Sequence, residues 1–126
     1  MKQLQKIADK YLKQLNGAVT YENAVASAED MGYTVMYYSD EVCSAMLEKC
    51  NLIELSKKYN ALTYSNDSAN FMFIKDSIGY DDALCAIYHE IVHILLGHLS
   101  LNPYIQNERR NEMQAEALAY AILNYK

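Results

Sequence analysis

The sequence has few of the residues that mark several common classes of protein. It contains only two arginines among its 126 residues and carries a formal net charge of −5, which argues against a phosphate-binding surface. No apolar run approaches the roughly 20 residues of a membrane span. The amphipathic N-terminus also lacks the apolar segment of a signal peptide. We therefore expect a cytoplasmic protein that binds neither nucleic acid nor membrane directly.

Cysteine and proline are scarce as well. The three cysteines are odd in number and have no CxxC spacing, which suits a reducing compartment. Cys43 and Cys50 are seven residues apart on one predicted helix and are expected to pack as small hydrophobes, whereas Cys85 lies one turn before His89 on another. The single proline, Pro103, falls between the last two predicted helices. No repeat, linker or low-complexity tract divides the chain.

The length and the hydrophobic content of 52% favour a single domain over residues 1–126. Apolar periodicity and turn residues predict helices at 2–16, 21–31, 40–49, 81–98 and 108–124, and strands at 33–38, 61–64 and 70–74. The helix at 40–49 could continue toward residue 58. We expect Asp81 or Asp82 to cap the helix at 81–98 and Gly97 to end it. This order predicts an α+β fold, mostly helical, with a short sheet beside that helix.

The most informative stretch is His89-Glu90-Ile91-Val92-His93. Residues at i and i+4 lie on one face of an α-helix, so both imidazoles can bind one metal ion and leave its other positions open. Glu90 lies about 100° further round the helix, where a general base for metal-bound water is expected. The surrounding helix is apolar almost all round, and buried histidines beside a buried glutamate are costly unless a metal ion or another partner binds them. An ordinary helix can also carry this pattern by chance.

A catalytic zinc ion normally has three protein ligands and a water. We expect Glu112, in the last helix, to be the third ligand. Glu116, four residues later on the same face, is expected to accept a hydrogen bond from a ligating imidazole. The alternative is that both carboxylates are solvated and pair with Arg109 or Arg110. His98, five residues after the motif, is expected to point away from the metal, near the carbonyl end of its helix.

The two motifs together resemble the ImmA/IrrE family of metallopeptidases. The likeness is carried by the histidine motif with its Leu-Leu-Gly-His continuation, His89–His98, and by the acidic helix segment Glu112–Ala119. The chain differs from the family at Glu116, where Asn or Asp is usual, and at Leu118, where an aromatic residue is usual. It also ends where family members often continue, so no further C-terminal domain is expected.

The resemblance implies a small, zincin-like domain of the gluzincin type and a cytoplasmic zinc peptidase. It makes His89, His93 and Glu112 the metal ligands and Glu90 the base. It further implies a role in transcription regulation, because family members relieve repression in phages, mobile elements or stress responses by acting on helix-turn-helix repressors. No helix-turn-helix pattern occurs in this chain, so DNA would be read by a separate partner.

The mechanism predicted from these residues is zinc-assisted peptide hydrolysis. Zinc would lower the pKa of its water toward about 7 and polarise the scissile carbonyl, and Glu90 would carry the proton to the leaving amine. A donor for the developing oxyanion is also needed. Tyr80, Tyr88 and Tyr104 are candidates among which the sequence does not choose.

The strand at 70–75 precedes the histidine helix, so we expect it to form the edge of the sheet above the metal. There Phe71, Met72 and Phe73 would bind an extended peptide substrate through main-chain hydrogen bonds. Alternatively, Phe71 and Phe73 simply pack in the core on alternate positions.

Two other functional hypotheses remain open on the sequence. A metal-stabilised domain could displace a repressor by binding it, without cleavage. The motif could also be a remnant that binds no metal. Zinc is favoured over manganese or iron by availability and by the geometry of a His-His-Glu site.

Overall fold

The computed structural model describes residues 2–15, 18–97 and 109–124. The described part of the chain contains six helices and a three-stranded mixed sheet, which confirms the predicted α+β class. The elements are, in chain order, α1 (Lys2–Gln14), α2 (Tyr21–Asp30), β1 (Thr34–Tyr37), α3 (Glu41–Lys49), α4 (Ile53–Ser56), β2 (Ala61–Ser65), β3 (Asn70–Ile74), α5 (Tyr80–Leu95) and α6 (Arg109–Leu123). None of these helices is both long enough and apolar enough to cross a membrane.

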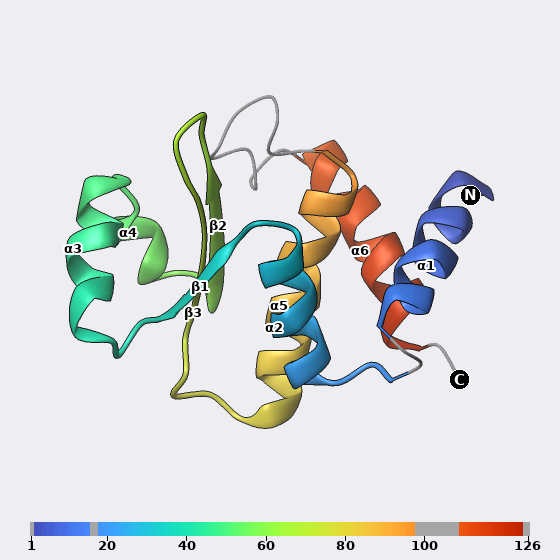
Figure 1. The fold of residues 1–126 in the computed structure, drawn as a ribbon, viewed down its shortest axis with the longest axis horizontal. Coiled ribbons are helices and arrows are strands. Elements are labelled where there is room, and N and C mark those ends of the chain that lie inside the picture. The colour runs from blue at the N-terminus through green and yellow to red at the C-terminus, as the bar shows by residue number, and fades with distance from the viewer. Residues whose placement is uncertain (1, 16–17, 98–108, 125–126) are drawn as a thin grey trace.

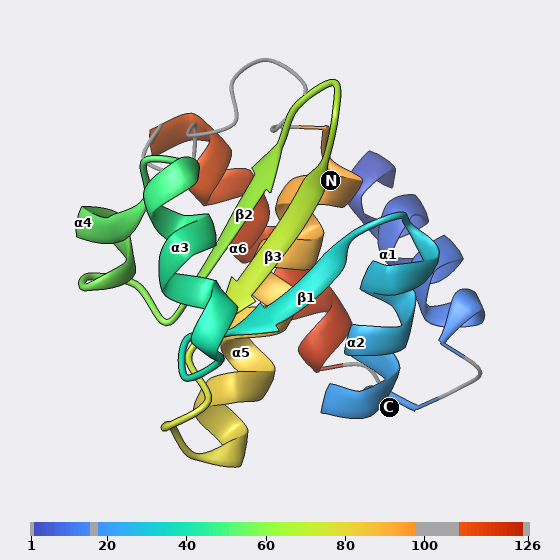
Figure 2. The same ribbon diagram turned by 60° about the vertical axis from the view of Figure 1, so that its left-hand side comes forward.

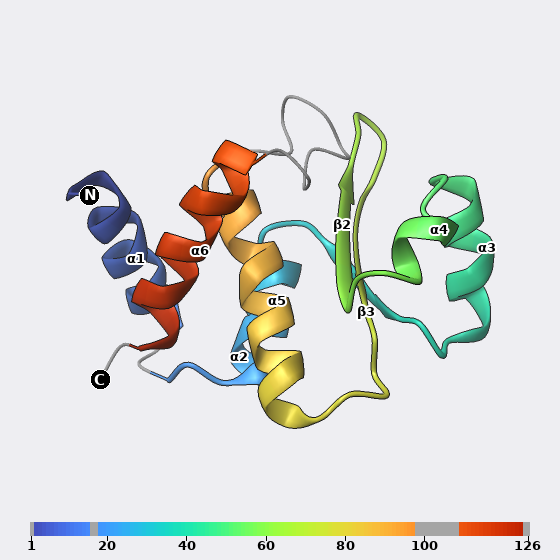
Figure 3. The ribbon, with the colours of Figure 1, turned by 180° about the vertical axis from the view of Figure 1, so that it is seen from behind.

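The elements form layers on either side of the sheet. In Figure 1 the sheet is seen nearly edge-on, with α3 and α4 against one face and α2 and α5 against the other. Figure 3, from behind, shows α6 beside α5 and α1 beyond α6. The helix that carries the histidine motif is therefore the middle of the molecule, since it packs against the sheet on one side and against α6 on the other.

The order of the strands differs from our expectation. The sheet runs β1-β3-β2, with β1 parallel and β2 antiparallel to β3 (Figure 2). The prediction that the strand at 70–75 forms the edge is therefore wrong, because β3 is hydrogen-bonded on both sides. The physical reason is that β3 is apolar on both faces: Met72, Phe73 and Ile74 are consecutive and all fully buried, as in a strand whose two faces are both covered. In the described sheet, β2 is an outer strand.

Successive side chains of the strands point to opposite faces of the sheet, and each face packs against its own apolar cluster. Met72 and Ile74 of β3 face the larger cluster, which is shared with α1, α2, α5 and α6. Phe73, with Leu62 of β2, faces the smaller cluster under α3 and α4. Cys43 and Cys50 belong to the smaller cluster, so they pack as small hydrophobes as predicted.

The ends of the helices have local causes. Asn51, with φ of 62°, ends α3, so this helix does not continue toward residue 58. Gly79 is the N-cap of α5, so the prediction that Asp81 or Asp82 caps this helix is wrong. Both aspartates lie in its first turn, where their negative charges interact favourably with the helix dipole. Gly97, with φ of 73°, follows α5 and ends it as expected.

Candidate metal centre

The first part of the site comes from one face of α5. His89 and His93, one turn apart, direct their Nε2 atoms toward one another at 3.3 Å, and their rings meet edge to face with centroids 4.9 Å apart. The side chain of His93 is fully buried, while that of His89 is 31% exposed. One imidazole is thus held firmly in the core while the other borders solvent.

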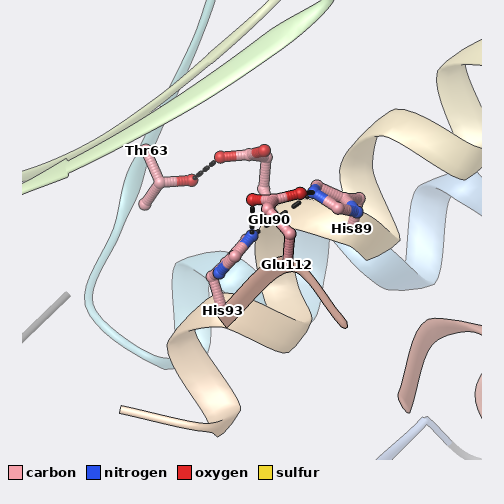
Figure 4. Close-up of polar contacts among 5 residues, drawn as sticks. All are labelled: Thr63, His89, Glu90, His93 and Glu112. Carbon is pink, nitrogen blue, oxygen red and sulfur yellow. Dashed lines mark hydrogen bonds and ion pairs between the residues drawn. The ribbon is translucent and has the colours of Figure 1, made fainter. Parts of the chain in front are cut away.

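The second part comes from α6, which packs on α5 through small and apolar residues. Ala115, Leu118 and Ile122 of this helix are fully buried in the larger apolar cluster. This packing brings Glu112 to both imidazoles: its Oε2 lies 3.1 Å from Nε2 of His89, and its Oε1 lies 3.0 Å from Nε2 of His93 (Figure 4). Two segments that are distant in sequence therefore converge as predicted.

The three side chains fit a metal ion. One ligand atom from each of His89, His93 and Glu112 lies within 4.8 Å of the other two, so the group can hold a metal ion. Ligand atoms about 2.1 Å from a common ion, at the corners of a tetrahedron, are about 3.4 Å apart. The observed distances are close to that value: the two imidazole nitrogens are 3.3 Å apart, and the carboxylate oxygens lie 3.0 and 3.1 Å from them.

The carboxylate between the histidines is held by the sheet. Glu90 is only 3% exposed, and its Oε1 accepts a hydrogen bond of 2.7 Å from Oγ1 of Thr63, which is 1% exposed (Figure 4). Thr63 lies in β2 on the face that α5 covers, so the outer strand orients this carboxylate. Sequence reasoning missed Thr63. The sequence feature that could have indicated it is a threonine hydroxyl within the otherwise apolar start of the strand predicted at 61–64.

A cavity of about 320 Å³ adjoins the site between β2 and α5. His89 and Glu90 lie at one end of its lining; the remaining lining residues are Tyr59, Asn60, Ala61, Asp82, Cys85 and Ala86. The backbone carbonyl of Tyr59 accepts a hydrogen bond of 2.9 Å from the hydroxyl of Tyr38. Burial, and then the charge of Glu90, raise the pKa of Tyr38, so this hydroxyl stays protonated as a donor.

Two of the three candidate oxyanion donors are engaged elsewhere. Tyr88 is fully buried and donates to the backbone carbonyl of Thr20 at 2.9 Å, and burial raises its pKa. The hydroxyl of Tyr80 accepts a hydrogen bond from the backbone N–H of Tyr21. Both therefore contact the start of α2 and not the histidines. Tyr104 and also His98 lie outside the described residues.

The outer residues of the predicted site have different outcomes. Glu116 is exposed, and its hydrogen bond to a ligating imidazole stays a prediction. Phe71, Met72 and Phe73, predicted to bind substrate, lie on the central strand. Phe71 and Phe73 pack against each other with ring centroids 5.8 Å apart, which agrees with the alternative of core packing. Cys85 is exposed in the cavity and is not one of the three residues that can hold the metal.

Comparisons with known proteins identify no relative: no family model matches the chain, and neither the curated proteins nor the solved structures contain a match.

Proposed function

We propose that the protein is a zinc-dependent peptidase whose metal ligands are His89, His93 and Glu112. The observation that carries the proposal is the convergence of two imidazoles and one carboxylate beside a buried second carboxylate, Glu90. Three protein ligands that leave a fourth position open are typical of catalytic zinc sites, whereas structural zinc sites are closed by four. A mixed set of nitrogen and oxygen ligands at near-tetrahedral spacing favours zinc.

The neighbouring residues supply the other parts of a hydrolytic site. A zinc ion, when bound, would lower the pKa of a coordinated water toward about 7 and polarise a carbonyl oxygen. Glu90 would take one proton from the attacking water and deliver it to the nitrogen that leaves as the C–N bond breaks. Thr63 donates to Oε1 of Glu90 and so fixes the orientation of the carboxylate that would carry the proton. Thr63 is a positioning residue in this scheme, since it acts through Glu90.

The substrate would lie in the cavity between β2 and α5. Its lining includes the start of β2, which pairs with β3 on one side only in the described sheet. An extended peptide can be bound at such a strand by main-chain hydrogen bonds. The motif resemblance to ImmA/IrrE peptidases suggests a helix-turn-helix repressor as the protein substrate and relief of repression in a phage, mobile element or stress response as the outcome.

Metal content and the Glu90→Gln variant test the proposal together. Purified protein should contain about one zinc per chain, and Glu90→Gln should keep that zinc while peptide cleavage falls by at least about 100-fold. Glu48→Gln, a matched change on exposed α3 across the sheet, should leave cleavage unchanged. Absence of bound metal would overturn the proposal. If Glu90→Gln instead still relieves repression, the protein acts by binding its partner without cleavage.

A further inference from the structure

The cavity beside the metal centre has an uneven distribution of charge along its length. His89 and the buried Glu90 line one end of the cavity, and Asp82 lies two helical turns earlier on α5, at the other end. The rest of the wall is made of uncharged side chains, namely Tyr59, Asn60, Ala61, Cys85 and Ala86. No described lysine or arginine lines the cavity, so its charged groups apart from histidine are carboxylates.

We propose that this cavity selects a lysine or arginine side chain of the substrate, next to the scissile peptide bond, and that Asp82 binds its terminal cation. The inference rests on the proposed peptidase function, because it places the scissile bond at the His89 end. Asp82 would thus be a specificity-determining residue.

The length of the cavity favours a long, straight side chain. Seven residues of α-helix separate Asp82 from His89, which corresponds to about 10 Å along the axis of α5. A side chain that starts near the histidines must extend along the small residues of this face to reach the carboxylate. Lysine and arginine have an apolar stem with a charged end, and such stems pack along apolar surface while the charge stays at its polar partner. Leucine or alanine would leave Asp82 without a contact.

The carboxylate of Asp82 is available for this role. Within the described ranges it forms no hydrogen bond and no ion pair, and it is exposed at the cavity. Tyr59, on the β2 side, adds an aromatic side chain to the same cavity, and aromatic faces attract lysine and arginine cations. The negative charge of Asp82 also interacts favourably with the dipole of α5, as any acidic residue in a first turn does. Asp81, its exposed neighbour in the same turn, shares that effect but does not line the cavity, so it offers a matched control.

The first experiment maps cleavage specificity. Native protein loaded with zinc is incubated with a mixed-sequence peptide library, and the residues on either side of each cut bond are identified by mass spectrometry. We expect lysine and arginine to be favoured about five-fold over norleucine at one adjacent position, which is the upper end of the range for ion pairs at an exposed carboxylate. Asp82→Asn should abolish the preference, Asp82→Lys should reverse it toward glutamate, and Asp81→Asn should leave it unchanged.

The second experiment needs no catalysis. Butylammonium, which reproduces a lysine side chain, is titrated into the zinc-loaded protein and followed by the amide NMR shifts of Asp82 and Ala86. Saturable shifts that butanol does not produce, and that Asp82→Asn removes, support the inference even if no peptide is cleaved and the peptidase proposal fails. Cleavage without a basic preference, a preference that survives Asp82→Asn, or equal shifts with butanol would overturn it.

Discussion

The hydrogen bond from Thr63 to Glu90 offers a test of how the sheet supports the candidate metal centre. Thr63→Val removes the hydroxyl and keeps the shape of the side chain, so Oε1 of a carboxylate that is 3% exposed loses a donor at 2.7 Å. A hydrogen bond to a charged group contributes about 1.5–3 kcal/mol. If that bond fixes the orientation of the base, its loss should lower kcat/KM by about ten- to a hundred-fold.

The variant is compared with Thr63→Ser, which keeps the hydroxyl and should retain most of the activity. Zinc content should be unchanged in both variants, because Thr63 does not contact His89, His93 or Glu112 in the described contacts. The assay is kcat/KM on a peptide that the native protein cleaves, with zinc measured by elemental analysis. Thr63→Val at more than half of the native kcat/KM, with zinc bound, would refute the positioning role.

A thermodynamic cycle tests the same bond without a substrate. Thr63→Val should lower the free energy of unfolding in urea by about 1.5–3 kcal/mol in the native background. In a Glu90→Met background the carboxylate is absent, so the same change should cost far less. Equal costs in the two backgrounds would mean that the threonine stabilises the strand by its packing alone.

Four further outcomes are expected. Glu112→Gln should weaken zinc binding by at least about 100-fold in a chelator competition, beyond the loss expected for an outer partner; native-like affinity would exclude Glu112 as a ligand. Tyr88→Phe should cost about 1 kcal/mol in urea unfolding, because the hydroxyl donates to the carbonyl of Thr20, and should leave zinc binding unchanged. Burial raises the pKa of Tyr11 from 10.0 to about 12, so between these pH values the unfolded phenol ionises first and stability should fall as pH rises, as measured by alkaline denaturation. Gly97→Ala should cost about 1 kcal/mol, since φ is 73° there; an unchanged melting temperature would contradict this.

The parts of the site that could be predicted from sequence are those set by helical geometry. His89 and His93 had to share a face of α5 once that segment was helical, and Glu90 had to lie beside them. Glu112 could be anticipated because it begins an acidic pair on a helix where Ala115 and Ala119 lie close to the acidic stripe and permit close packing. The positions of the two histidines and Glu90 follow from spacing within one helix, whereas the approach of Glu112 is a contact between α5 and α6, which the structure also shows.

The parts that failed depend on contacts between elements. Strand order depends on which faces of the sheet are covered. The consecutive apolar residues Met72–Ile74 indicated a central strand, but we predicted an edge strand from its position just before the histidine helix. Thr63 acquires its role only because β2 lies over α5, which no pattern within residues 61–65 specifies. The prediction of the N-cap of α5 was wrong for a local reason, because Gly79 is the N-cap and the helix begins before either aspartate.

The candidate metal centre, His89, His93 and Glu112, is difficult to explain as a structural element alone. His93 is fully buried, yet its Nε2 lies 3.3 Å from a second imidazole nitrogen and 3.0 Å from a carboxylate oxygen, where an apolar side chain could fill the same space. Burying polar groups costs free energy unless they are paired, and replacing such a cluster with hydrophobic residues is often neutral or stabilising. The α5–α6 contact already has Ala115, Leu118 and Ile122 to hold it together. A cation bound by all three ligand side chains accounts for the arrangement at once, because it offsets the desolvation of the imidazoles and of the carboxylate together.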